Sequence, residues 1–195
     1  MTEQTEKKLD DIKKEADRKN CPVQKSLYFI DEFLSGPMCG KCFPCSFGSY
    51  EARVRLRRLA GGTGSEEDVA AVKRIASNMS EASMCKKGKD TAKYILEHID
   101  SKEFAEHVSG VCARNECMEY FKYVIVPDKC DMCGICLDVC KDNAITGEKK
   151  KSYLSGYRPF EIAQKRCSKC GKCVTVCPTG AIVVVNVKER ETAGV

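Results

Sequence analysis

Two cysteine runs, CDMCGICLDVC at residues 130–140 and CSKCGKCVTVCP at residues 167–178, are the most informative part of this chain. Both runs follow the spacing C-x2-C-x2-C-x3-C, and a proline follows the fourth cysteine in the second run. In the first run Lys141 takes the place of that proline. The two runs therefore form an internal repeat, and the fold must bring their cysteines into two equivalent settings.

This spacing is typical of bacterial two-cluster ferredoxins, in which the fourth cysteine of each run ligates the cluster of the other run. We therefore predict two ligand sets for 4Fe–4S clusters. They are Cys130, Cys133, Cys136 and Cys177 for one cluster, and Cys140, Cys167, Cys170 and Cys173 for the other. A disulfide framework or zinc knuckles fit less well, because zinc sites pair CxxC with CxxC and do not use triple runs.

A third run, Cys39, Cys42 and Cys45, has the spacing C-x2-C-x2-C but no fourth cysteine close behind it. The sequence then predicts a helix over Ser49–Leu59, a glycine-rich turn, and a second helix that Ser65 caps ahead of an acidic first turn. Cys85 follows this second helix and completes a set of four for one 4Fe–4S cluster. A zinc site with the same four thiolates is the alternative, because zinc also accepts four thiolates.

His107, Cys112 and Cys117 lie at intervals of five between the two cysteine-rich parts. We consider them a candidate zinc site, with Cys21 or His98 as the fourth ligand of a tetrahedral centre. Free buried thiols with a surface histidine are the alternative, because a five-residue spacing is not diagnostic.

Charge and hydropathy exclude several classes of function. The formal net charge of +5 counts every cysteine as neutral, and the negative charge of cluster-bound thiolates would offset this surplus, so we expect no nucleic-acid partner. The longest apolar run, Ala181–Val185, has the length of a strand, and we expect no membrane span. The charged start lacks the apolar segment of a secretory signal, so we expect a cytoplasmic protein with metal-ligating thiols.

The order of these motifs resembles a known family: the C-terminal iron–sulfur region of the NADH-binding, F-type subunit of respiratory complex I. The resemblance rests on the run Cys39-Gly40-Lys41-Cys42-Phe43-Pro44-Cys45, on the basic helix behind it, and on Cys85 about forty residues later. Similar subunits of bifurcating hydrogenases and NAD-linked formate dehydrogenases continue into a two-cluster ferredoxin tail. The resemblance covers about residues 24–187 and implies one cluster in a helical domain and two in a ferredoxin domain.

The chain departs from this family at its beginning. The flavin- and NADH-binding part of the family normally precedes this region, whereas about twenty charged residues precede it here. The glycines of Gly61-Gly62-Thr63-Gly64 lie between two expected helices, which is not the strand-to-helix setting of a dinucleotide-binding loop. No flavin or NADH residue can be carried over, and the chain resembles the end of that subunit as a separate small subunit.

The predicted fold class is α + (α+β), with an N-terminal helical bundle that holds one cluster and a two-cluster ferredoxin domain behind it. We expect the ferredoxin domain to repeat the order strand, cluster loop, short helix, strand. The expected divisions are a charged helix or arm (1–22), a helical iron–sulfur domain (23–108), a junction with the candidate zinc site (109–122), the ferredoxin domain (123–187) and a tail (188–195).

These features predict an electron-transfer subunit of an anaerobic multi-subunit oxidoreductase, which relays single electrons through three 4Fe–4S clusters. The expected partners are a flavin- or metal-containing subunit on one side and another subunit or soluble ferredoxin on the other. The sequence has no Ser/His/Asp set and no flavin motif, so we expect no catalysis by this chain alone. The alternative is a free-standing iron–sulfur binding module whose clusters are structural or sense redox state.

Overall fold

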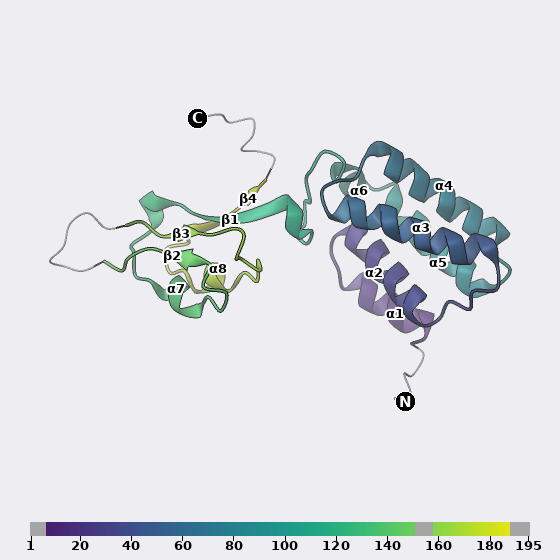
Figure 1. The fold of residues 1–195 in the computed structure, drawn as a ribbon, viewed down its shortest axis with the longest axis horizontal. Coiled ribbons are helices and arrows are strands. Elements are labelled where there is room, and N and C mark those ends of the chain that lie inside the picture. Colours follow the sequence, from purple (N-terminus) through teal and green to yellow (C-terminus); the bar gives the residue numbers. More distant parts are fainter. Residues whose placement is uncertain (1–6, 151–157, 188–195) are drawn as a thin grey trace. The chain divides into compact units, whose positions relative to one another are not determined.

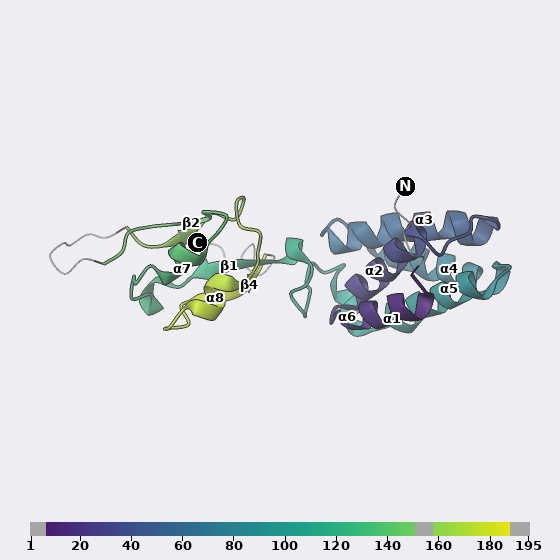
Figure 2. The ribbon, with the colours of Figure 1, turned by 90° about the horizontal axis from the view of Figure 1, so that it is seen from below.

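The computed structural model describes residues 7–150 and 158–187 and divides the chain into two compact units, Met1–Tyr120 and Phe121–Val195 (Figures 1 and 2). The expected tail at 188–195 and the first six residues of the expected N-terminal arm lie outside the described residues. In the part of the chain that the structure describes, none of the helices has both the length and the apolar character that crossing a bilayer requires.

The first unit is helical. Its elements are α1 (Leu9–Asp17), α2 (Pro22–Ser35), α3 (Phe43–Ala60), α4 (Glu66–Ala82), α5 (Lys86–Ile99), α6 (Lys102–Glu106) and the 3-10 turn η1 (Met118–Tyr120). Helix α3 packs against α4, α4 packs against α5, and α2 packs against both α3 and α5 (Figure 1). The result is a bundle in which the loops before α3 and α5 carry the cysteines of the third run and Cys85.

Helix α3 begins earlier than the sequence predicts. The expected start was Ser49, but the helix begins at Phe43 and includes Pro44 in its first turn. Proline is tolerated there because the first N–H groups of a helix have no partner inside the helix. Cys42 is therefore the residue that precedes the helix, and Cys45 lies on its first turn.

Helix α4 begins where the sequence predicts. The Ser65 hydroxyl accepts a hydrogen bond from the Asp68 amide, and the Asp68 carboxylate accepts one from the Ser65 amide, which makes a capping box. The same buried carboxylate pairs with Arg55 of α3 at 2.9 Å. The cap therefore also joins α3 to α4.

The core of the first unit consists of apolar side chains from the five helices α2 to α6 and from the segment behind α6. Its fully buried members include Val23, Ile30, Leu56, Leu59, Val72, Ala76, Ile95, Phe104, Cys21 and Cys117. Helix α1 adds a separate cluster, in which Ile12 and Ala16 are buried against Phe29 and Tyr94. The charged helix near the N-terminus therefore lies on the protein's own surface and is not a free arm over its described residues.

The second unit has the repeated order that the sequence predicts. Its elements are β1 (Phe121–Ile125), η2 (Pro127–Lys129), α7 (Ile135–Val139), β2 (Ile145–Thr146), β3 (Glu161–Ile162), α8 (Lys172–Val176) and β4 (Ile182–Asn186). Strand β1 pairs antiparallel with β4, so that Phe121 lies opposite Asn186 and Ile125 opposite Ile182. Strand β2 pairs antiparallel with β3. The outer strands of the two halves therefore meet each other, and the two cysteine runs lie between them in sequence.

Candidate metal centres

The two cysteine runs of the second unit have the same local backbone. Gly134 and Gly171 precede α7 and α8 with φ of 79° and 75°, a left-handed conformation that glycine adopts without strain. Met132 and Lys169 occupy the same place in each run and also have positive φ, of 60° and 55°. Each run therefore turns between its first and second cysteine and again between its second and third. The third cysteines, Cys136 and Cys173, are buried.

The fourth cysteine of each run is held by the same hydrogen bond. The Ala144 amide donates to Cys140 Sγ at 3.3 Å, and the Ala181 amide donates to Cys177 Sγ at 3.3 Å. Amide donors to a sulfur stabilise its thiolate form, which is the form that binds iron. In the structure the backbone behind each short helix therefore points an N–H at the expected ligand.

The cysteines of the first predicted set lie around one small pocket. Its lining includes Cys130, Cys133, Cys136 and Cys177. The remaining lining is largely apolar, with Ile125, Phe160 and Ile182 among it. Burial raises the pKa of the Cys136 thiol to about 11, and the neighbouring Cys130 and Cys133 add to the increase. A buried thiol whose charged form is disfavoured in this way suits a site that supplies compensating positive charge, as iron does.

The second predicted set is arranged in a similar way. Burial raises the pKa of the Cys173 thiol, and Cys167 and Cys170 add to it because their charges lie nearby. Cys140 packs against the same apolar cluster that contains Cys173. In each set one cysteine is exposed to solvent, Cys133 in the first and Cys170 in the second.

The helical unit brings its four candidate cysteines to one end of the bundle. Cys42 and Cys45 are buried at the start of α3, Cys39 is exposed, and Cys85 precedes α5. Burial raises the pKa of the Cys45 thiol to about 11, and Cys42, Cys85 and Cys39 contribute through their charges. A hydrogen bond from the Met84 backbone lowers the pKa of Cys42, because the loop before α5 lies against the third run.

A further group of candidate ligands is compact enough to hold a single ion. Among the described residues, one group of candidate ligands has all its ligand atoms within 4.8 Å of one another, and none of the twelve cysteines above belongs to it. Thiolates on one zinc ion stand about 3.8 Å apart, given a tetrahedral angle and a Zn–S length of about 2.3 Å.

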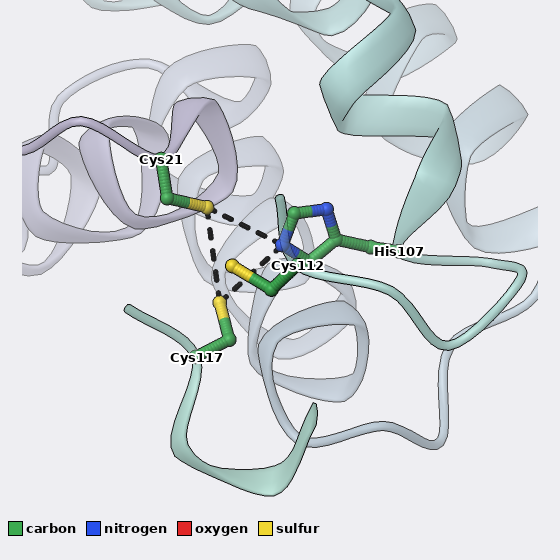
Figure 3. Close-up of side chains that lie close together, drawn as sticks. All are labelled: Cys21, His107, Cys112 and Cys117. Atoms are coloured by element: carbon green, nitrogen blue, oxygen red, sulfur yellow. Dashed lines mark hydrogen bonds between the residues drawn. The ribbon is translucent and has the colours of Figure 1, made fainter. Parts of the chain in front are cut away.

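The compact group consists of Cys21, His107, Cys112 and Cys117, all buried (Figure 3). Cys21 Sγ lies 3.3 Å from His107 Nε2 and 3.8 Å from Cys117 Sγ. Cys117 Sγ lies 3.4 Å from the same ring nitrogen. Figure 3 shows the four side chains pointing toward one another, from the start of α2, the end of α6 and the loop behind it. These separations are close to the edges of a tetrahedral zinc site, about 3.8 Å between sulfurs and about 3.6 Å between sulfur and nitrogen.

Neighbouring groups hold these ligands in place. The Nδ1 of His107 lies 2.8 Å from the Glu103 carbonyl oxygen, so that Nε2 faces the sulfurs; zinc-bound histidines have the same arrangement. The Tyr120 hydroxyl donates to the His107 carbonyl at 3.0 Å, and the Gln24 amide donates to Cys117 Sγ at 3.3 Å. The Glu116 carboxylate accepts the Cys21 amide at 2.9 Å and thereby fixes the start of α2 beside the loop.

The electrostatics of the group fit a buried cation. Burial lowers the pKa of His107, but hydrogen bonds to Cys112 and Cys21 outweigh it and raise this pKa to about 10. Hydrogen bonds from Cys117 and Cys21 lower the pKa of Cys112, whereas that of Cys117 is raised by the same pair interactions and by burial. The positive charge of the His107 ring and the negative charge of the Cys112 thiolate thus stabilise each other inside the core. A zinc ion at this position would supply the positive charge directly.

The structure selects Cys21 as the fourth member of this group and places His98 elsewhere. The ring of His98 packs edge-on against Tyr94, with 4.8 Å between the ring centroids. Sequence reasoning had no basis for choosing between Cys21 and His98, and it did not identify Glu103, Glu116 or Gln24. The one local signal was the position of Cys21 directly before Pro22, a residue that favours the first position of a helix.

Comparison with known protein families identifies two regions. Residues 25–109 match the NADH-ubiquinone oxidoreductase-F iron–sulfur binding region, and residues 129–181 match the 4Fe-4S dicluster domain. The first region includes Cys39, Cys42, Cys45 and Cys85, and the second includes both cysteine runs of the repeat. The resemblance that the sequence motifs suggest is therefore confirmed.

Three curated relatives illustrate the range of similar proteins. The NADP-reducing hydrogenase subunit HndC of Solidesulfovibrio fructosivorans is 32% identical over 140 residues, which is 70% of this chain and 28% of HndC. The F subunit of NADH-quinone oxidoreductase in Streptomyces coelicolor is 33% identical over 81 residues, 40% of this chain and 18% of that protein. The NADP(+)-dependent formate dehydrogenase subunit beta of Moorella thermoacetica is 34% identical over 67 residues, 34% of this chain and 10% of that protein. The chain thus spans between a tenth and just over a quarter of the length of these relatives.

Proposed function

The chain is an iron–sulfur electron-transfer module related to subunits of NADH-type oxidoreductases, hydrogenases and formate dehydrogenases, and we propose that it relays single electrons through three 4Fe–4S clusters within such a complex. The proposed ligands are Cys39, Cys42, Cys45 and Cys85 for one cluster; Cys130, Cys133, Cys136 and Cys177 for the second; and Cys140, Cys167, Cys170 and Cys173 for the third. When bound, the clusters accept and release one electron at a time.

One observation carries this proposal: each proposed ligand set has a buried side and an exposed cysteine. The exposed residues are Cys39, Cys133 and Cys170, whereas Cys45, Cys136 and Cys173 are buried. A cluster with a purely structural role has no need of an exposed edge, but a cluster that exchanges electrons with a partner does. The chain's own residues hold the clusters, exclude water on the inner side and leave the outer side accessible.

We assign one end of the electron-transfer path to the helical unit and the other end to the ferredoxin domain. The cluster of the helical unit exchanges electrons with a flavin- or metal-containing partner subunit, and the ferredoxin pair exchanges them with another subunit or with soluble ferredoxin. The relatives that support this are named as subunits of a hydrogenase, a quinone oxidoreductase and a formate dehydrogenase. All fifteen cysteines are free of disulfides, which suits a reducing compartment, and a cytoplasmic location is part of the proposal.

Zinc at Cys21, His107, Cys112 and Cys117 forms a separate part of the proposal. Four protein ligands that close a tetrahedron leave no open position, which is the mark of a structural site. Zinc has no redox chemistry, so this site takes no part in electron transfer. Its ligands join the start of α2 to the segment between α6 and η1, and its role would be to fold that segment onto the bundle.

Iron and sulfide quantitation with EPR of the reduced protein tests the proposed function. Three clusters require about twelve iron and twelve sulfide atoms per chain, four of each per cluster. Interacting signals from neighbouring clusters are expected after reduction. Eight iron atoms or fewer would contradict the three-cluster assignment.

A variant separates the electron-transfer proposal from the alternative of structural or redox-sensing clusters. Cys39→Ala should remove the helical cluster, leave the ferredoxin signals, and stop electron transfer across the intact complex. Unchanged turnover would place this cluster outside the path. The alternative predicts clusters in the wild-type protein that the partner's electrons do not reduce.

A further inference from the structure

A stripe of exposed apolar side chains runs along α3. Phe43 is 73% exposed, Phe47 58%, Tyr50 47% and Val54 50%. Their spacing of three and four residues places them on one face of the helix. The rings of Phe43 and Phe47 stack with 5.2 Å between their centroids. Large aromatic side chains gathered on one face are uncommon on a surface that meets only water, and they typically mark an interface.

The stripe borders a groove between α3 and α4. The groove is lined by Phe43, Pro44, Phe47, Gly48, Ile75, Asn78, Glu81 and Ala82. Helices α3 and α4 lie side by side in the first unit (Figure 1). A groove that aromatic and small residues line can accept an apolar side chain from another protein.

The stripe begins at the proposed cluster of the helical unit. Phe43 lies between Cys42 and Cys45 in the chain, and the thiol of Cys39 is itself exposed. Met84, which precedes Cys85, is 83% exposed. Exposed residues of this ligand set and of the apolar face are therefore neighbours in the chain.

The same end of the bundle carries three exposed cations. Lys41, Lys86 and Lys87 flank Cys42 and Cys85 in sequence. No ion pair joins their ammonium groups to a carboxylate within residues 7–150 and 158–187. One carboxylate, that of Glu81, is among the groove-lining residues. The end next to the proposed ligands is thus apolar in its middle and positive at its border.

We propose that this face, defined by Lys41, Phe43, Phe47, Tyr50, Met84, Lys86 and Lys87 and called the α3 face, is the docking surface for an acidic redox protein that exchanges electrons with the helical cluster. The proposal rests on the proposed function for the electron exchange. Complementary charge favours a partner with carboxylates around its redox centre, because opposite charges speed encounter and orient the partner. A second copy of this chain fits poorly, since two positive borders would face each other.

Photo-cross-linking in the intact complex tests which molecule binds the α3 face. The full-length chain carries a benzophenone amino acid in place of Phe47, and a control protein carries it in place of Lys14, an exposed residue of α1. The Phe47 site should yield an adduct with a protein that contains a flavin or an iron–sulfur cluster, at an Asp/Glu-rich peptide. An adduct only with a second copy, a lipid or nucleic acid, or a yield no higher than that at Lys14, would overturn the proposal.

Charge reversal supplies the second measurement. Lys41→Glu, Lys86→Glu and Lys87→Glu together should lower the adduct yield and slow reduction of the helical cluster by about tenfold or more at low ionic strength. Lys8→Glu, Lys14→Glu and Lys102→Glu make the same change in net charge on exposed residues elsewhere and should leave both values unchanged. Equal behaviour of the two triple variants, with full iron content, would overturn the proposal.

The two proposals can fail separately. If the wild-type protein holds its clusters and transfers electrons while the α3 face gives no adduct, the docking surface is wrong and the function stands. If the adduct forms and depends on the three lysines but the clusters are absent or are not reduced, the face binds a partner and the electron-transfer function is wrong.

Discussion

The Sγ of Cys21 lies 3.3 Å from the Nε2 of His107, although 86 positions separate the two residues in the chain. Cys21 precedes α2, and His107 follows α6. The contact therefore joins the beginning of the helical bundle to its last helix, at a point where Cys112 and Cys117 also converge. Such a long-range junction of buried ligands has consequences that metal analysis can measure.

Removal of either residue should remove zinc. Cys21→Ala and His107→Ala are each expected to lower the zinc content from about one ion per chain to near zero and to leave the iron content unchanged. His98→Asn is the matched control, because His98 packs on Tyr94 and should not affect zinc. Metal analysis by mass spectrometry checks this, and zinc loss in His98→Asn with retention in Cys21→Ala would contradict the assignment.

Two buried serines should tune the helical cluster. The hydroxyls of Ser49 and Ser83 are both buried. Burial raises the pKa of Cys45, and the Ser49 hydroxyl lowers it. Ser83 lies near the same thiol, because Cys45 Sγ and Ser83 Oγ are both 3.0 Å from the position that a Cβ on Gly88 would occupy. Hydrogen bonds to cluster sulfur stabilise the reduced, more negative state. Ser49→Ala and Ser83→Ala should therefore lower the midpoint potential of this cluster, by on the order of tens of millivolts for a one-electron couple.

Redox titration followed by EPR measures this change. Ser26→Ala is the matched control, because Ser26 is also buried with an unpartnered hydroxyl but belongs to α2. The potentials of the ferredoxin clusters should stay constant in all three variants. If Ser26→Ala shifts the midpoint potential of the helical cluster as much as Ser49→Ala does, the shift comes from a general packing effect and the prediction is wrong.

The fourth cysteines should serve the opposite runs. Cys177 lines the pocket of Cys130, Cys133 and Cys136. In a protein whose Cys167, Cys170 and Cys173 are all replaced by alanine, we expect about eight iron atoms per chain. Adding Cys177→Ala should lower the count toward four, and adding Cys140→Ala should not. Iron quantitation measures these counts. A lower iron count with Cys140→Ala but not with Cys177→Ala would mean that each run keeps its own fourth cysteine.

The capping carboxylate of α4 should stabilise the helical unit. Asp68 is fully buried and pairs with Arg55 at 2.9 Å and Arg58 at 3.2 Å. Asp68→Asn should lower the free energy of unfolding by about 1–3 kcal/mol, from the lost charge pairs and a weaker cap. Asp100→Asn, which removes an exposed pair with Lys73, should cost less than about 1 kcal/mol. Denaturant unfolding of the two variants checks the difference, and equal losses would contradict it.

The pH dependence of this effect follows from the pKa of Asp68. Burial raises this pKa, but Arg55 and the Ser65 cap outweigh burial and leave it below the ordinary 3.8. A lowered pKa in the folded state gives stability that is present above the unfolded value and is lost as pH falls through the folded value. The destabilisation by Asp68→Asn should therefore be the same at pH 8 and pH 5. A marked decrease between these values would mean that the pKa of Asp68 in the folded protein is raised above its ordinary value and not lowered.

Local spacing made part of this structure predictable. The order of a helical region and a ferredoxin-like domain could be predicted from the spacing of the cysteine runs. Three ligands within a few residues need a tight turn, and the residues between the cysteines form that turn. Gly134 and Gly171 lie at those turns and have a left-handed conformation in the structure. The cap at Ser65 is equally local, so the start of α4 could also be predicted.

Other features could not be predicted locally. The sequence places Phe43 and Phe47 in what looks like a cluster loop, but α3 begins at Phe43 and presents both rings on one exposed helix face. Proline in the second position of a cysteine run indicates a loop as readily as a first helical turn. The α3 face was therefore missed.

The sequence by itself determined the twelve candidate cluster cysteines and the family of both regions, because ligand identity and spacing are properties of short segments. Only the tertiary structure decided that Cys21, and not His98, faces His107, Cys112 and Cys117. That choice depends on how α2 packs against α6 and on the Glu116 carboxylate that holds the Cys21 amide. Such contacts join residues far apart in the chain, and no local pattern encodes their distance.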